Sequence, residues 1–150
     1  MRGYCAIGIY QPKFNVNIGA LWRSAYIFGA AYIFTIGKRY KEQASDTLKA
    51  PRHIPLYNFA SLNDFKSTMP YGARLVCVEI TDNAYDLTSF AHPERAIYLL
   101  GAEDNGLPAE ILKGNIVVSI PNQRNYCLNV SVAGSLIMYD RYVKKLGRKA

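Results

Sequence analysis

Three short segments combine small and polar residues in patterns that suit ligand binding. The first, NIGALWR at residues 17–23, has small residues one helical turn before Arg23, which leaves space for a ligand beside the guanidinium. The second, LGAEDNGLP at 100–108, places two acids between glycines that allow close backbone approach and a tight turn. The third joins IPN at 120–122 to LNVSVA at 128–133, where the free N–H groups of a helix start bind ligands. Ordinary turns and capped helices show the same patterns, so no single segment decides a function.

Motifs of several other protein classes are missing. The GxGxxG of dinucleotide-binding proteins follows no strand. Neither the GxxxxGK[ST] of P-loop NTPases nor the GxSxG nucleophile elbow occurs. His53 and His92 are isolated, which is more typical of loop or surface histidines than of a catalytic base. The three cysteines, Cys5, Cys77 and Cys127, are widely spaced and form no CxxC pair. We therefore predict no disulfide framework and no metal site, and we expect a reducing, cytoplasmic compartment.

The apolar pattern predicts an α/β fold whose elements hold these segments. Strands are predicted over 4–10, 31–36, 55–59, 74–81, 95–100 and 115–120, and helices over 17–29, 61–69, 108–113 and 129–146. Because the strands look buried on both faces, we expect a mostly parallel sheet with helices on both faces. Each segment then follows a strand at the edge where open α/β sheets bind ligands.

Length and charge narrow the class of protein further. The chain has 150 residues, half of them hydrophobic, which excludes a disordered protein and indicates one domain over 1–150. No apolar run is long enough to cross a membrane, and the first residues do not form a signal peptide. The 18 Lys and Arg exceed the 11 Asp and Glu and give a net charge of +7, which favours a polyanionic partner such as nucleic acid.

The basic residues are concentrated in two places. A patternless stretch at 37–54 is predicted to be a basic loop, and the last helix carries basic residues spaced i, i+3, i+4 and i+7. That spacing predicts one positive face, opposite an apolar face formed by Leu136, Ile137 and Val143. We predict that both places hold RNA phosphates, although a solvated helix face explains the helix equally well. The predicted RNA-binding residues are Lys38, Arg39, Lys41, Arg141, Lys144, Lys145 and Arg148.

Taken together and in this order, the three segments resemble the motifs of the TrmH-like (SpoU) branch of the SPOUT superfamily, which are RNA ribose 2′-O-methyltransferases. The resemblance covers about residues 4 to 146. It implies an α/β domain with a deep trefoil knot in its C-terminal part, S-adenosylmethionine as the cofactor and a homodimer. Because no separate RNA-binding domain is apparent at either end, the resemblance favours tRNA as the substrate.

The resemblance also implies roles for individual residues. Those expected to line or flank the cofactor pocket are Val78, Glu79, Leu100, Gly101, Ile120 and Leu128. Those that match catalytic positions are Asn17, Arg23, Glu103 and Asn129. Arginine stays protonated at physiological pH, so Arg23 is expected to orient the ribose hydroxyl or a phosphate as a cation instead of acting as a base.

One departure from the family pattern keeps alternatives open. Cys127 stands where the family usually has Ser, and a thiol is the weaker hydrogen-bonding group. One alternative is a catalytically silent, RNA-binding homologue. Another is a base methyltransferase on the same fold, although the Asn17 and Arg23 pair is of the ribose type. A third is a flavodoxin-like binding domain, which would be an unknotted monomer.

Overall fold

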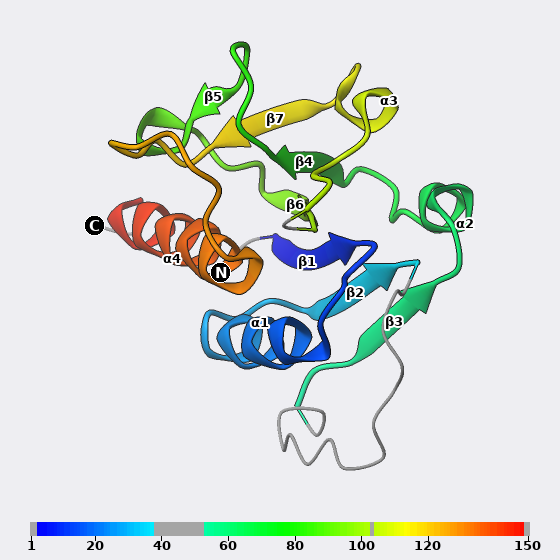
Figure 1. Cartoon of the computed structure of the whole chain (residues 1–150). Helices are drawn as coiled ribbons and strands as arrows, with labels where there is room; N and C mark the ends of the chain where they lie inside the picture. The colour runs from blue at the N-terminus through cyan, green and yellow to red at the C-terminus, as the bar shows by residue number, and fades with distance from the viewer. Residues whose placement is uncertain (1–2, 38–52, 103, 149–150) are drawn as a thin grey trace.

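The computed structural model describes residues 3–37, 53–102 and 104–148 (Figure 1). In these ranges the strands form one seven-stranded sheet with the order β3-β2-β1-β6-β4-β7-β5. All pairings between these strands are parallel, as predicted. The strands are β1 (Tyr4–Tyr10), β2 (Tyr32–Ile36), β3 (Leu56–Phe59), β4 (Arg74–Val78), β5 (Tyr85–Asp86), β6 (Arg95–Gly101) and β7 (Ile116–Ser119).

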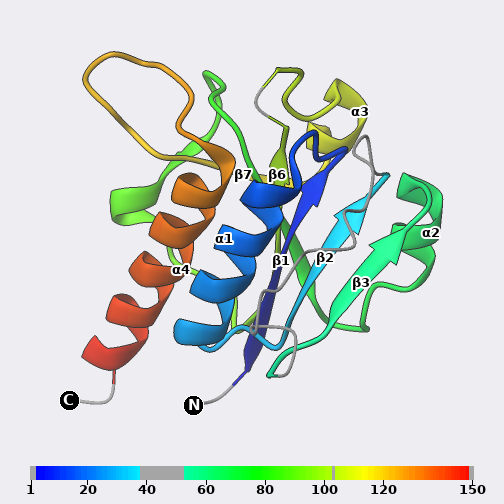
Figure 2. The ribbon, with the colours of Figure 1, turned by 60° about the horizontal axis from the view of Figure 1, so that its bottom comes forward.

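Helices cover both faces of the sheet. They are α1 (Asn15–Ile27), α2 (Leu62–Ser67), α3 (Ala109–Leu112) and α4 (Val130–Gly147). Helices α1 and α4 lie side by side on one face (Figures 1 and 2), and α2 and α3 contribute to the core on the other. Successive side chains of a strand point to opposite faces, so Ile7 and Ile9 face α1 and α4, whereas Ala6 faces the other layer.

Helices α1 and α4 pack closely because Gly134 has no side chain. A Cβ atom on Gly134 would lie 2.5 Å from Leu21 Cδ1, closer than two carbon atoms can approach. One residue later, a hydrogen bond of 2.7 Å joins Ser135 Oγ to Ser24 Oγ. The two helices therefore form one rigid layer, and this layer fixes the position of the start of α4.

Most predicted elements agree with the structure, but the start of α1 differs. Ser61 and Asn129 cap α2 and α4 as their sequence positions suggest, each accepting backbone N–H hydrogen bonds through its side chain. The first helix was predicted over residues 17–29, and this start is two residues too late. The helix begins at Asn15, and Phe14 occupies the cap position without a side-chain hydrogen bond.

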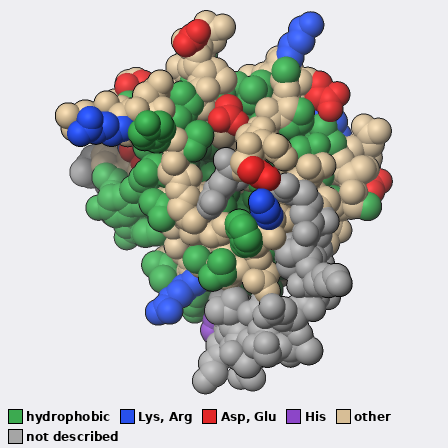
Figure 3. Space-filling model, in the orientation of Figure 1, with side chains coloured by type: hydrophobic (Ala, Val, Ile, Leu, Met, Phe, Trp, Pro, Cys, Tyr) green, Lys and Arg blue, Asp and Glu red, His purple; other side chains and the backbone are tan. Residues whose placement is uncertain are grey.

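The predicted face assignment of the last helix is also wrong. Leu136 and Val143 were expected in the core but are 40% and 44% exposed, whereas Arg141 and Lys145 are buried, at 4% and 9%. The physical reason is a set of backbone carbonyl oxygens beneath the helix, which the Arg141 guanidinium satisfies. Figure 3 shows hydrophobic side chains gathered on the side of the molecule where α4 and α1 lie. The exposed apolar side chains on these helices are Val16, Tyr26, Ile27, Val132, Leu136, Tyr139, Tyr142, Val143 and Leu146.

The trefoil knot stays a prediction. Residues 38–52 of the expected basic loop, including Lys38, Arg39 and Lys41, lie outside the described residues, as does Glu103. In the part of the chain that is described, no helix is long and apolar enough to span a membrane.

Candidate active site

The loops that follow β4, β6 and β7 meet at one end of the sheet, opposite the two chain ends (Figure 2). Between them lies a cavity of about 460 Å³, which we call the main cavity. All six residues expected to bind the cofactor line it: Val78, Glu79, Leu100, Gly101, Ile120 and Leu128. The structure thus brings together side chains that are up to 50 positions apart in the sequence. Parallel strands explain this, because their carboxyl ends share one edge.

The described residues of the loop after β6 form a tight turn. The Gly106 N–H donates to the Ala102 carbonyl oxygen at 2.9 Å, and Gly106 adopts a φ of +61°, which favours glycine. A Cβ atom on Gly101 would collide with the Gly106 backbone, so only glycine fits there. Glu79 braces the same loop, because its Oε2 atom accepts a hydrogen bond of 2.9 Å from the Leu107 N–H. The carboxylate of Glu79 therefore shapes one cavity wall.

The loop before α4 forms the opposite wall. The Asn122 side chain accepts from the Tyr126 N–H at 3.2 Å and donates to the Tyr126 carbonyl at 3.1 Å, which fixes the turn. Asn129 then caps α4 by accepting from the Ser131 and Val132 N–H groups. The Asn129 amide also donates to Asn17 Oδ1 at 3.1 Å. Two predicted catalytic residues, 112 positions apart, are therefore in direct contact.

The lining of the main cavity suits an organic ligand with an apolar body. Apolar side chains such as Leu100, Ile120 and Leu128 alternate with the exposed backbone of two loops. Backbone N–H and C=O groups supply directed hydrogen bonds, and apolar walls accept a ring system. Among the described residues, no group of three or more His, Cys, Asp or Glu side chains is placed to hold a metal ion.

A second cavity of about 270 Å³ adjoins the main one. It is lined by Ile9, Pro12, Lys13, Phe14, Asn17, Ala102, Asp104 and Val130. Ala102, Asp104 and Val130 line both cavities and so form the wall between them. Lys13 and Phe14 were not predicted from the sequence, since nothing in their local pattern separates them from an ordinary loop before a helix.

Arg23 lies apart from the two cavities. Its side chain is exposed and lines neither cavity. It lies on the outer face of α1, on the same stripe as the exposed Val16 and Ile27. The structure therefore brings Asn17 and Asn129 together and leaves Arg23 at the surface.

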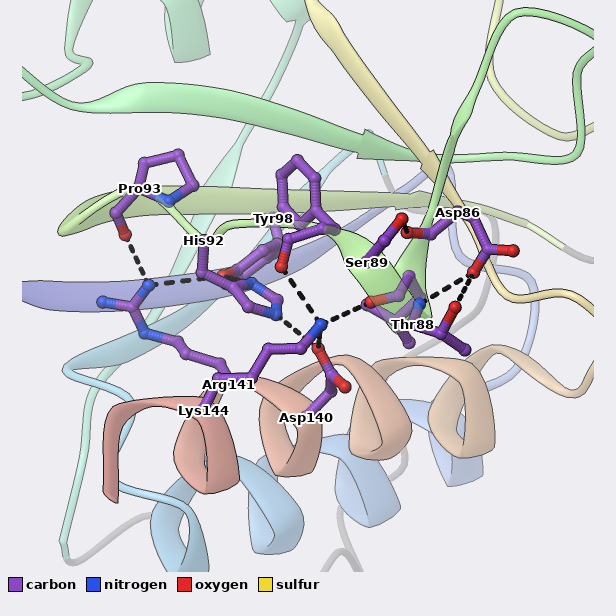
Figure 4. Close-up of polar contacts among 11 residues, drawn as sticks. Asp86, Thr88, Ser89, His92, Pro93, Tyr98, Asp140, Arg141 and Lys144 are labelled. Atoms are coloured by element: carbon purple, nitrogen blue, oxygen red, sulfur yellow. Dashed lines mark hydrogen bonds and ion pairs between the residues drawn. The ribbon is translucent and has the colours of Figure 1, made fainter. Parts of the chain in front are cut away.

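The predicted positive face of α4 is largely a buried polar cluster (Figure 4). Arg141 donates to the carbonyl oxygens of Pro93 at 2.6 Å and Glu94 at 2.7 Å, and also to that of Tyr4. Lys144 pairs with Asp140 at 2.7 Å and donates to the Phe90 carbonyl at 3.0 Å. Four residues of α4 were predicted to bind RNA. Of these, only Arg148 has an exposed side chain without such contacts in the structure. The prediction of one exposed positive face is therefore wrong.

His92 is the centre of this cluster and not a surface residue. Its Nε2 atom lies 2.7 Å from Asp140 Oδ2, and its Nδ1 atom lies 2.6 Å from the Tyr98 hydroxyl. A carboxylate only accepts, so Nε2 carries the proton and the Tyr98 hydroxyl donates to Nδ1. Burial lowers the pKa of His92, and the bond to Asp140 opposes that shift only in part. Burial likewise raises the pKa of Tyr98. Both rings are therefore neutral near pH 7.

The chain has relatives among RNA-modifying proteins. It is 29% identical over 134 residues to the mouse "tRNA (guanosine(18)-2'-O)-methyltransferase TARBP1", a match that covers 83% of this chain but only 8% of the mouse protein. The fold agrees with a solved structure titled "Structural insights into the 2-OH methylation of C/U34 on tRNA", with a TM-score of 0.86, 24% identity and coverage of 97% and 98%. It also agrees with an AdoMet-bound rRNA methyltransferase from Sinorhizobium meliloti, with a TM-score of 0.82, 21% identity and coverage of 97% and 58%.

At these identities the structural matches establish the fold, and the match to the family establishes descent. The family model described as "SpoU rRNA Methylase family" matches residues 5–139, which include most of β1, the main cavity and the first half of α4. On this evidence the chain belongs to the SpoU rRNA methylase family.

Proposed function

We propose that the protein is an S-adenosylmethionine-dependent ribose 2′-O-methyltransferase that acts on RNA, and on tRNA in particular. One observation carries the proposal: the six residues that the family motifs assign to the cofactor line a single cavity, beside the contact between Asn17 and Asn129. Family membership gives the reaction class. The relative named for tRNA guanosine 18 and the structure named for C/U34 on tRNA both favour tRNA.

The main cavity fits the proposed cofactor. Leu100, Ile120 and Leu128 offer apolar contacts for an adenine ring, and the backbone of the two loops offers hydrogen bonds to its edge. When bound, S-adenosylmethionine supplies a methyl group activated by its sulfonium. The side chain of Glu79 is already committed to the Leu107 N–H, so we infer that it acts by holding the loop in shape.

The remaining residues of the proposal act on the RNA. Asn17 lies at the boundary of the second cavity, where its amide is suited to orient a ribose hydroxyl. Arg23 carries a permanent charge that can bind a phosphate or stabilise negative charge developing on the attacking oxygen. Glu103 and Asn129 stay proposed catalytic residues on the strength of the family motifs.

We infer a homodimer formed through the outer faces of α1 and α4. Val132, Leu136 and Val143 lie on one stripe of α4, and this exposed apolar surface continues onto α1 (Figure 3). Exposed apolar patches of this kind mark association surfaces. Arg23 lies on the same face of α1, so in such a dimer it would be at the subunit boundary. Light scattering should give about twice 16.8 kDa, and a monomeric mass would contradict the dimer.

Substrate binding must then use surfaces other than the inner part of α4. The net charge of +7 supports attraction to RNA phosphates. Arg148 is exposed and stays a proposed RNA-binding residue, together with Lys38, Arg39 and Lys41. The free cysteines Cys5, Cys77 and Cys127 support a reducing, cytoplasmic location.

The test begins with cofactor binding. Calorimetry with S-adenosylmethionine should show binding to the unmodified protein. Gly101→Ala should weaken it by about tenfold or more, because the added Cβ displaces the loop against Gly106. Gly147→Ala is the matched control, since a Cβ there meets no atom within 4 Å. Absence of binding to the unmodified protein would support a silent homologue.

The second step identifies the product. Total tRNA incubated with the protein and labelled cofactor should gain a 2′-O-methylated nucleoside, detected by mass spectrometry of the nucleosides. Mapping of the site then distinguishes guanosine 18 from position 34, the positions named for the two relatives. A methylated base with an unmodified ribose would contradict the proposed reaction.

A further inference from the structure

The second cavity has the features of a nucleotide-binding subsite. It opens beside the main cavity and shares with it a wall formed by Ala102, Asp104 and Val130. Its volume of about 270 Å³ is little more than half that of the main cavity. A nucleotide held there would have its ribose next to the shared wall. Such a subsite rests on the proposed function, because it requires a methyl donor on the other side of that wall.

Phe14 gives this cavity an aromatic surface. The ring is 49% exposed, although Phe14 directly precedes α1, where an apolar residue usually packs inward. The Lys13 Nζ atom lies 5.5 Å from the centre of the ring, so a cation already rests against its π-face. An exposed aromatic ring next to a lysine is the combination that proteins use to stack a base and bind its phosphate.

Lys13 is available for exchange with a phosphate. Its Nζ atom lies 3.9 Å from Asp104 Oδ2, and the two side chains are 52% and 37% exposed. A long, exposed ion pair of this kind contributes little to stability, so an incoming phosphate can replace the carboxylate. As Lys13 turns toward a phosphate, it uncovers the face of the Phe14 ring. Lys13 also offsets the negative charge of Asp104, which would otherwise repel RNA.

We propose that the second cavity is the acceptor subsite: the base stacks on Phe14, Lys13 binds the adjacent phosphate, and the ribose reaches Asn17, which lines the same cavity. Because a cavity of about 270 Å³ is too small for a base pair, the acceptor must be unpaired or turned out of its helix. Stacking on Phe14 tolerates every base, so this subsite positions the nucleotide without selecting its identity.

Steady-state methylation of total tRNA tests the subsite, because substitutions there should change the KM for tRNA and leave the Kd for S-adenosylmethionine unchanged. Phe14→Leu keeps an apolar side chain but removes the π-face, and it should raise the KM for tRNA by about tenfold. Phe14→Trp should restore most of the affinity. Lys13→Ala should raise KM and reduce the salt dependence of binding. The Kd for S-adenosylmethionine should stay within about twofold in all three variants, which a general packing defect would not allow.

Two controls match the aromatic and the charged substitution. Tyr71→Ala removes a ring that is 99% exposed and lines neither cavity. Lys66→Ala removes an exposed lysine from α2, on the opposite face of the sheet. Neither change should alter the KM for tRNA. If Phe14→Leu and Lys13→Ala also leave this KM unchanged in an active protein, the subsite proposal is wrong.

Ultraviolet crosslinking gives a readout that does not need turnover. Total tRNA irradiated with the protein should crosslink to the peptide containing Phe14, and unlabelled tRNA should compete. If the unmodified protein binds no S-adenosylmethionine and transfers no methyl group, the proposed function fails, and crosslinking alone decides the subsite. Crosslinks confined to other peptides would overturn it.

Discussion

The polar groups at the two ends of α4 have opposite surroundings. At its start, Asn129 contacts Asn17, which lines the second cavity, and Val130 lines both cavities. In its second half, Asp140, Arg141 and Lys144 lie under a loop and bond to protein atoms on several sides. No buried side-chain nitrogen or oxygen lacks a partner among the described residues. Polar groups saturated by the protein hold the fold, and polar groups that line a cavity can serve a ligand.

Two arginines make the difference concrete. Arg141 is 4% exposed and donates to backbone carbonyls at the start of β1 and just before β6. Arg23 is exposed on the outer face of α1. The guanidinium group is the same in both, so the surroundings decide whether it stabilises the fold or is available to RNA. Substitution of each arginine should therefore affect a different measurement.

Arg141→Ala should cause the largest loss. The change leaves the carbonyl oxygens of Tyr4, Pro93 and Glu94 without their donor, and we expect the free energy of unfolding to fall by about 3 kcal/mol. Urea denaturation measures this. Arg148→Ala on the same helix should change it by less than about 0.5 kcal/mol. Equal effects of the two substitutions would mean that the buried cluster does not hold α4 in place.

Arg23→Ala should affect turnover and leave the fold intact. We expect the rate of methyl transfer at saturating tRNA and cofactor to fall by about 100-fold, because the proposed role of Arg23 is to stabilise negative charge on the attacking oxygen. The urea midpoint and the Kd for S-adenosylmethionine should match those of the unmodified protein. Single-turnover transfer measures the rate, and undiminished turnover would exclude Arg23 from the reaction.

The fold was largely predictable because its signals are local. Buried strands such as β1 and β6 appear as uninterrupted apolar runs, and Ser61 and Asn129 mark helix starts. The two-residue strand β5 was missed, since Tyr85–Asp86 is too short to show a period. The positions that line the main cavity were expected from the resemblance to the SpoU motifs, and they meet in the structure because they follow the ends of parallel strands.

The orientation of α4 was not predictable from its own residues. Its buried face contains Arg141 and Lys145, and its exposed face contains Leu136 and Val143, the reverse of the usual pattern. Only the carbonyl groups of residues 93 and 94, which are distant in the sequence, explain this. His92 lies in a loop, as expected, but its burial was not predictable for the same reason, because its partners Tyr98 and Asp140 come from other elements.

Acidification should destabilise the buried polar cluster around His92 before it affects the residues that line the cavities. Burial lowers the pKa of His92 below its ordinary value of 6.5. The titratable groups that face it are Asp140, Arg141 and Lys144 of α4 and Tyr98 of β6. Below pH 6.5 the unfolded chain binds a proton that the folded protein resists, so stability falls on acidification, by no more than about 1.4 kcal/mol per pH unit. Thermal denaturation between pH 8 and 5 measures the slope.

His92→Gln provides the comparison for that slope. The variant should be less stable at every pH, because buried hydrogen bonds are lost, but its stability should decline less between pH 6.5 and 5. An unchanged pH dependence would assign the acid sensitivity to other groups.

Cys127→Ser should have the smallest effect of these changes. Cys127 is exposed and lines the main cavity in a loop whose course is set by Asn122 and Tyr126. If this part of the wall binds the cofactor through its backbone, replacement of a thiol by a hydroxyl leaves the ligand contacts in place. The Kd for S-adenosylmethionine should then stay within about twofold of the original, as calorimetry can measure. A gain of tenfold or more would mean that the side chain itself touches the ligand. Ligand binding in the main cavity would then depend on a side chain, as the buried cluster around Arg141 does. The two halves of α4 would differ only in how exposed their polar groups are.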